Sequence, residues 1–270
     1  MSRLKDADDF GNRMKAYEAI ETARRLDSQA PIYARIDGRA FSKFTRGMAK
    51  PFDPWMTAAM IETTKYLVHE THARIGYTQS DEISLVWQAD APESDVFFSG
   101  KAQKMVSVLA SMAAAKFARL LTPSLAERMP HFDCRVFQLP SREEAANAFL
   151  WRAMDARKNA ISMAAQSVFS HRQLFEKGQS DMLAMLAERG VDFEAFPEAF
   201  KRGSFVRRVT GARDLTAGEL ARIPEKHRPS GPVIRSEVVA VPMPPFNRVA
   251  NRAAVVFDAA PPVEIVSQAA

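Results

Sequence analysis

Hydrophobic and polar positions follow one another along the first half of the chain in a regular succession of strand and helix patterns. Short runs rich in β-branched and aromatic residues predict strands, and longer runs with apolar residues three or four positions apart predict helices. The order βαββαβ is typical of the ferredoxin-like split βαβ unit, an antiparallel sheet with both helices on one face. We therefore expect an α+β fold. The predicted elements are strand 31–37, helix 54–72, strand 74–78, strand 83–88, helix 101–120 and strand 134–139.

The second half predicts a helical and loop-rich elaboration of this core. Ser141 and Glu144 form a capping-box pattern that opens a helix reaching Phe169. Shorter helices are predicted at 181–189 and at 216–223, the latter from a second capping box, and strands at 233–241 and 253–257. We expect a palm-like core over residues 1–140 and an elaboration over residues 141–270 that together form one continuous domain.

Two acidic residues stand where predicted strands end. Asp37 and Gly38 follow the first strand, and Asp81 lies in Gln79-Ser80-Asp81-Glu82, which predicts a hairpin connection slightly longer than two residues. Asp-Gly is also an everyday turn, so each acid alone is more often structural. In the βαββαβ unit, however, the first strand neighbours the central hairpin. Asp37 and Asp81 are then expected to converge and to hold two Mg²⁺ ions, an arrangement used for displacement at phosphorus.

These strings carry a resemblance to a known family. The chain resembles the tRNA-histidine guanylyltransferase family and its 3′-to-5′ polymerase relatives over roughly residues 10 to 210. The matching pieces, in order, are Arg35-Ile36-Asp37-Gly38-Arg39 with Phe41 and Phe44, Ala49-Lys50-Pro51 with Asp53, Ser80-Asp81-Glu82 with Ser84, Phe132-Asp133 with Arg135, Trp151-Arg152, Asp155, Asn159 and Lys201-Arg202-Gly203-Ser204.

The resemblance implies a polymerase-type palm that adds nucleotides to the 5′ end of tRNA. It implies that Asp37, the Gly38 carbonyl and Asp81 bind two Mg²⁺ ions, with Glu82 as a supporting catalytic carboxylate. The implied substrates are GTP, ATP or other nucleoside triphosphates, and the implied assembly is a homo-oligomer, a tetramer. The residues implied to bind the nucleotide are Arg39, Lys50, Asp53, Ser80 and Asn159.

The chain also departs from the family pattern. Where the dedicated enzymes have His-Ile-Asn-Asn-Leu-Tyr-Asn, this chain has Arg157-Lys158-Asn159-Ala160-Ile161-Ser162-Met163. Ser42 replaces a histidine, and Ile83 replaces a tyrosine. These departures favour the guanylyltransferase-like branch, whose activity resembles template-dependent repair of tRNA 5′ ends. The alternatives are a dedicated tRNA-histidine guanylyltransferase, a palm-type nucleotide cyclase and a non-catalytic RNA-binding relative.

The basic residues are unevenly distributed. The net charge is +5, yet residues 201–235 contain nine Lys or Arg against three acids. A basic segment on a near-neutral body is expected of phosphate-backbone binding, although a solvated surface is the alternative for each residue. The residues expected to contact RNA are Arg157, Lys158, Lys201, Arg202, Arg207 and Arg208.

Composition narrows the remaining possibilities. With 270 residues, 47% of them hydrophobic and 26% charged, the chain is expected to be globular. It has no run of eighteen apolar residues, and residues 1–10 are mostly polar, so we expect no membrane span or signal peptide and a cytoplasmic protein. The single cysteine, Cys134, excludes an internal disulfide and is expected to pack in its strand.

Overall fold

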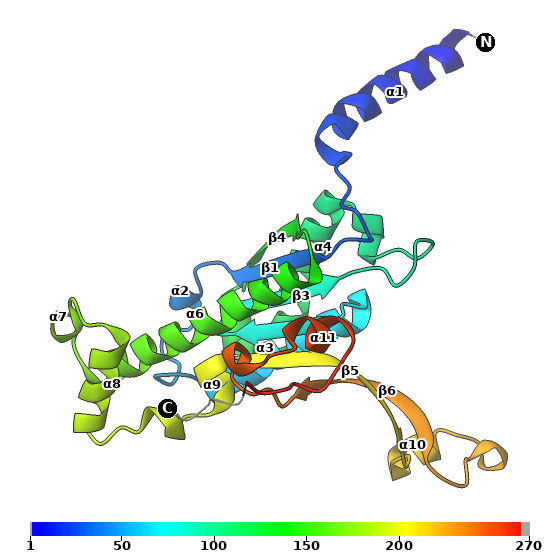
Figure 1. Cartoon of the computed structure of the whole chain (residues 1–270). Helices are drawn as coiled ribbons and strands as arrows, with labels where there is room; N and C mark the ends of the chain where they lie inside the picture. Colours follow the sequence, from blue (N-terminus) through cyan, green and yellow to red (C-terminus); the bar gives the residue numbers. More distant parts are fainter. Residues whose placement is uncertain (1, 266–270) are drawn as a thin grey trace.

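The computed structural model of the chain describes residues 2–265, which surround one antiparallel sheet (Figure 1). The strand order is β4-β1-β3-β2-β5-β6. The strands are β1 (Ile32–Gly38), β2 (Ile75–Gln79), β3 (Glu82–Trp87), β4 (Phe132–Gln138), β5 (Ser204–Arg213) and β6 (Val233–Val241). The α-helices are α1 (Ser2–Thr22), α2 (Phe41–Phe44), α3 (Pro54–Thr71), α4 (Ala102–Leu120), α5 (Pro123–Ala126), α6 (Arg142–Val168), α7 (His171–Leu174), α8 (Gln179–Glu188), α9 (Glu198–Arg202), α10 (Ala217–Ala221) and α11 (Arg252–Phe257). Short 3₁₀ turns are η1 (Phe97–Gly100), η2 (Phe193–Ala195), η3 (Glu225–His227) and η4 (Phe246–Arg248).

The first four strands confirm the predicted ferredoxin-like unit. They form the order β4-β1-β3-β2, and α3 and α4 pack together on one face of the sheet. Asp53 caps α3, as its Oδ1 accepts a hydrogen bond from the Met56 N–H at 3.0 Å, and Pro54 occupies the first turn. The apolar stripe of α3 that faces the sheet is buried, with Met56, Met60, Thr63 and Leu67 among its residues.

The hairpin between β2 and β3 is tighter than its sequence indicates. Gln79 pairs with Glu82, which leaves only Ser80 and Asp81 in the loop, so the expectation of a longer connection is wrong. Ser80 makes the short turn by adopting a positive φ of 49°. Asp81 is consequently held at the very tip of a rigid two-stranded element.

The other face of the sheet is covered by α6 and α11 (Figure 1). A second apolar core lies there, in which Tyr33 and Phe205 from the sheet meet Phe149 from α6. The predicted strand at 253–257 is wrong, because these residues form α11, whose Val255, Val256 and Phe257 are buried in this core. A five-residue apolar run does not distinguish a strand from a short buried helix.

Two elements leave the body of the protein. The strands β5 and β6 pair over nine positions, whereas β5 pairs with β2 over only three positions, all at its start. The far part of this ribbon, with α10 and η3 at its end, projects as an arm, and α1 projects from the opposite side (Figure 1). The sequence did not reveal β5, because its interrupted basic pattern suggested an RNA-contacting surface. In the part of the chain that the structure describes, no helix is both long and apolar enough to span a bilayer.

Gly203 fixes the point at which β5 joins the sheet, and this gives a stability prediction. Its φ is +73°, and a Cβ atom there would lie 2.6 Å from the Thr78 carbonyl oxygen. Because both the backbone strain and the clash oppose a side chain, Gly203→Ala should lower the free energy of unfolding by about 2 kcal/mol or more. Gly211→Ala, on the same strand with open space around it, should change it by less than about 0.5 kcal/mol. Urea denaturation measures both, and equal effects would contradict the argument.

Candidate active site at one end of the sheet

Asp37 and Asp81 meet at one end of the sheet, as the sequence predicts. Asp37 lies near the end of β1, where it pairs with Glu82 of β3, and the Gly38 N–H donates to the Asp81 carbonyl oxygen at 3.1 Å. Both carboxylates line a cavity of about 330 Å³. Gly38 has no room for a side chain, since the Phe41 ring packs over it. The backbone between the two acids is therefore held closely in place.

The two carboxylates repel each other in a partly dehydrated setting. Burial, followed by the charge of Asp37, raises the pKa of Asp81 to about 6. Burial and the charge of Asp133 raise the pKa of Asp37 above its usual range. Such mutual destabilisation is relieved by a cation, and hard carboxylate and carbonyl oxygens are the donors that Mg²⁺ prefers. The donor set therefore fits a magnesium site, although the described residues contain no cluster of three or more His, Cys, Asp or Glu arranged around one point.

Asp133 is a site residue that the sequence reasoning did not assign. It lies directly opposite Asp37 on β4, so the two side chains share one face of the sheet. Arg135 lies 3.8 Å from its carboxylate and neutralises part of its charge. The proximity of Asp133 to Asp37 follows from the register between β1 and β4, which the order of the elements does not give.

Glu82 lines the small cavity together with Asp37 and Asp81 and is held by an arginine. It is only 5% exposed, and its two oxygens accept hydrogen bonds from Arg152 Nε at 2.6 Å and Nη2 at 2.7 Å. Arg152 also donates to Asp155 on the same helix at 3.0 Å. Both oxygens of this supporting carboxylate are thus engaged by Arg152. Glu82 ties α6 to the sheet above the two aspartates.

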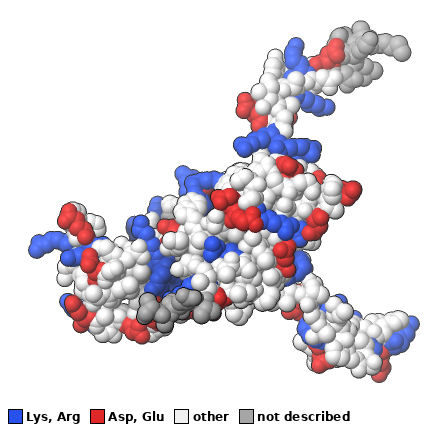
Figure 2. Space-filling model, in the orientation of Figure 1, with Lys and Arg blue, Asp and Glu red and all other residues white. Residues whose placement is uncertain are grey.

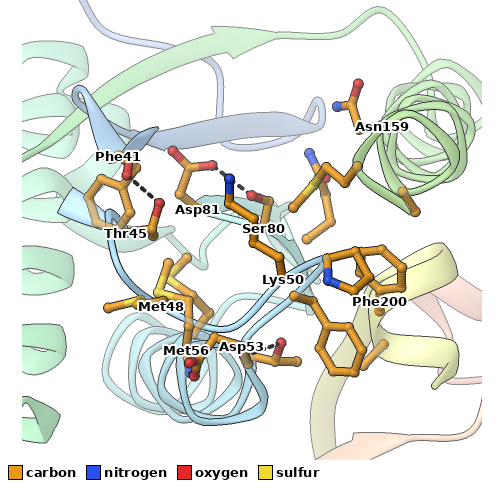
Figure 3. A pocket seen from close by; sticks show the side chains of 18 of the residues that line it. Phe41, Thr45, Met48, Lys50, Asp53, Met56, Ser80, Asp81, Asn159 and Phe200 are labelled. Atoms are coloured by element: carbon orange, nitrogen blue, oxygen red, sulfur yellow. Dashed lines mark hydrogen bonds between the residues drawn. The ribbon is translucent and has the colours of Figure 1, made fainter. Parts of the chain in front are cut away.

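A larger cavity of about 650 Å³ opens beside the aspartates (Figure 3). Figure 3 shows the Lys50 side chain extending toward Ser80 and Asp81, while apolar side chains line the cavity on both sides, Met48 and Met56 on one and Phe200 on the other. The cavity thus offers a cation near the carboxylates and an apolar surface suited to a nucleobase. Phe200 stacks on Phe52 with ring centroids 4.8 Å apart, which stiffens that side.

The remaining residues expected to bind nucleotide are divided by the structure. Ser80 and Asn159 line both cavities. Asp53 lines the large cavity, but its oxygens accept hydrogen bonds from the backbone N–H groups of Ala49 and Met56, so it positions the Lys50 loop. Arg39 is exposed and lines neither cavity, so it is not brought together with the others.

Several residues expected to contact RNA are engaged inside the protein. Lys201 is 3% exposed, with its ammonium bonded to the Glu194 carbonyl oxygen at 2.6 Å and to Glu198 at 2.7 Å, which contradicts an RNA contact. Arg202 pairs with Glu194 and Glu198. Arg157 pairs with Glu194 at 2.8 Å and covers the Phe193 ring.

The other expected RNA contacts remain accessible to different degrees. Lys158 is exposed on α6. Arg207 and Arg208 are half-buried on β5 and donate to the carbonyl oxygens of Val255 and His69. Figure 2 shows basic and acidic side chains interspersed over the body and the arm in this view. The excess of positive charge in the sequence is thus not one continuous basic face there.

Comparison with known proteins identifies the same arrangement elsewhere. A family model described as tRNAHis guanylyltransferase matches residues 11–140. A solved bacterial tRNA(His) guanylyltransferase-like protein in complex with ATP is 38% identical with a TM-score of 0.70, covering 73% of this chain and 88% of that one. Another, in complex with GTP, is 32% identical with a TM-score of 0.68, covering 86% and 90%. The tRNA(His) guanylyltransferase of Neurospora crassa is 27% identical over 71% of this chain and 72% of its own length.

The raised pKa of Asp81 predicts that ionisation of this carboxyl lowers the free energy of unfolding. Because this pKa of about 6 lies above that of an aspartate in the unfolded chain, ionisation disfavours the folded state. Stability from this group is therefore lost as the pH rises from about 4 to about 6. In EDTA, Asp81→Asn should be more stable than the unmodified protein by about 1 to 3 kcal/mol above pH 7, and the difference should vanish below pH 4. Urea denaturation across this range measures it, with exposed Glu93→Gln as the control. A variant that is less stable at pH 8 would contradict the repulsion.

Proposed function

This chain belongs to the tRNAHis guanylyltransferase family, and we propose that it repairs tRNA 5′ ends by metal-dependent, template-directed nucleotide addition. Enzymes of this family add nucleotides to tRNA in the 3′-to-5′ direction. The observation that carries the proposal is the meeting of Asp37 and Asp81 beside a cavity that presents Lys50 to the same point. A nucleotide bound in this cavity has its reacting groups next to two carboxylates whose charge the protein neutralises only in part.

The residues of the site divide the work in this proposal. Asp37, the Gly38 carbonyl and Asp81 hold Mg²⁺, which supplies charge neutralisation at phosphorus and at the attacking and leaving oxygens. Lys50 and Ser80 bind the triphosphate. In the overall reaction the tRNA 5′-monophosphate attacks the α-phosphorus of ATP or GTP and pyrophosphate leaves. The 3′-hydroxyl of the incoming nucleotide then attacks the tRNA 5′ phosphorus, a new phosphodiester bond forms, and AMP or GMP leaves. The Glu82–Arg152 pair keeps α6 over the reacting groups and contributes no atom to the reaction.

Selection by a template is supported by what α6 presents to the cavities. In the stretch that replaces the family's polar string, Ala160 and Ile161 are buried, and Arg157 is paired with Glu194. Asn159 is the member of that stretch that combines a place in both cavities with a carboxamide able to read a base edge. A site with so few groups to recognise one base is suited to selection by Watson–Crick pairing with the opposite strand.

The templated reaction is tested with tRNAs that lack one 5′ nucleotide and carry each of the four opposing bases. With all four triphosphates supplied, the added nucleotide should be the Watson–Crick partner of the opposing base. Sequencing of the extended 5′ ends measures this. Guanosine addition regardless of the opposing base, confined to tRNA-histidine, would show a dedicated guanylyltransferase instead.

The metal assignment predicts a loss of activity without a loss of fold. Asp37→Asn and Asp81→Asn should each reduce the rate of nucleotide addition by a factor of about a thousand or more, because charge neutralisation worth several kcal/mol disappears. Mg²⁺ should raise the melting temperature of the unmodified protein and of Glu93→Gln, but not that of either variant. Near-normal turnover in either variant would remove its residue from the metal site.

The RNA surface is tested by the salt dependence of binding. Lys158→Gln with Arg208→Gln should lower the slope of log affinity against log salt by roughly one to two units, since each lost phosphate contact removes slightly less than one. Lys201→Met should leave the slope unchanged, because that ammonium is buried among Glu194 and Glu198. Filter binding of tRNA at several salt concentrations measures both, and an unchanged slope in the double variant would return Lys158 and Arg208 to the ordinary surface.

A further inference from the structure

The carboxamide of Gln79 opens to the two cavities and has no hydrogen-bond partner among the described residues. Gln79 is the last residue of β2 and only 8% exposed. A carboxamide kept in this state at the boundary of two cavities is available to a ligand.

The surroundings of Gln79 indicate which ligand group it meets. The cations lie to either side of Gln79: Lys50 lines only the large cavity, and Arg152 lines only the small one, together with Asp37 and Glu82. The boundary itself is lined by Ser80, Asp81, Asn159, Met163 and Gln166 in addition to Gln79. A phosphate is normally met by cations, whereas a hydroxyl donates and accepts at once and matches a carboxamide, which does the same.

The position of Gln79 relative to the hairpin then selects one hydroxyl. Under the proposed function, on which this step rests, the 3′-hydroxyl of the incoming nucleotide lies at Asp37 and Asp81. The vicinal 2′-hydroxyl is the adjacent group on the same sugar, and Gln79 is separated from Asp81 by one residue at the base of the same tight turn. Gln79 also pairs with Glu82, whose bond to Arg152 holds this end of the strand.

We propose that Gln79 binds the 2′-hydroxyl of the nucleotide that lies across the two cavities, so that the site selects ribonucleotides over 2′-deoxyribonucleotides. The backbone of Gln79 is fixed in β2, so its amide stays next to the sugar and is left without a partner when the hydroxyl is missing. A polar group left unpaired by the wrong substrate is the usual basis of such discrimination.

The test is equilibrium binding of GTP, 2′-deoxyGTP and 3′-deoxyGTP in Mg²⁺ without RNA, by titration calorimetry. The unmodified protein should bind GTP about tenfold more tightly than 2′-deoxyGTP, the value of one neutral hydrogen bond. In Gln79→Met, which keeps the length of the side chain, the GTP affinity should fall to that for 2′-deoxyGTP and the ratio should approach one. The ratio of GTP to 3′-deoxyGTP should not change. Gln103→Met, on the exposed side of α4, is the matched control and should keep both ratios.

Three results would overturn the proposal: no preference for GTP in the unmodified protein, an unchanged preference in Gln79→Met, or a loss confined to the 3′-deoxyGTP ratio. If Gln79→Met does not fold, Gln79→Asn carries the same test, because it withdraws the amide by one methylene while keeping its polarity. The measurement requires no reaction. Absence of nucleotide addition to truncated tRNA would therefore refute the proposed function while leaving the binding ratios to decide the role of Gln79.

Discussion

The buried ion pair between Glu82 and Arg152 is the contact on which the geometry of the site depends. It joins β3 to α6 through two short hydrogen bonds, and both side chains are almost wholly buried. A buried ion pair contributes little net stability, because removing two charges from water offsets their attraction, yet losing one partner costs about 3 to 5 kcal/mol. The pair therefore acts as a specific lock between the helix and the sheet. Both cavities lie beneath α6 and take their depth from its position.

The Glu82–Arg152 ion pair also allows this end of the sheet to carry an excess of negative charge. Asp133, Asp37 and Glu82 occupy one row across β4, β1 and β3. Arg152 and Arg35 neutralise part of the charge of Glu82. The same two arginines partly offset the rise in the pKa of Asp37. What remains uncompensated is concentrated on Asp37 and Asp81. The protein thus places its least favourable electrostatics at the point where a cation and phosphates are proposed to bind, and it accepts a stability cost there.

The sequence was sufficient to predict local features of the fold, but it did not predict which residues of neighbouring strands lie opposite each other. The predicted ends of strands and helices in the core agree with the structure because alternation, Asp53 with Pro54 and the Ser141 cap are local signals. Convergence of Asp37 and Asp81 followed from the order of elements alone. The role of Asp133, the attachment of β5 and the tight Ser80-Asp81 turn all depend on strand register, which no local pattern encodes. The helix α11 was mistaken for a strand because burial, not periodicity, determines so short an apolar run.

The number of basic residues in a segment does not give the charge of the surface that the segment forms. Lys201 and Arg202 form ion pairs with Glu194 and Glu198, which precede them in sequence by only a few residues. On the arm, Arg213 is bound by Glu219 and by Glu237, and Glu237 lies beyond the segment whose excess of positive charge suggested RNA binding. A basic segment becomes a phosphate-binding surface only through the cations left over after such pairing. In this protein those cations lie on more than one element, so a bound RNA would be held by separated contacts along its backbone and oriented by the reacting end in the cavity.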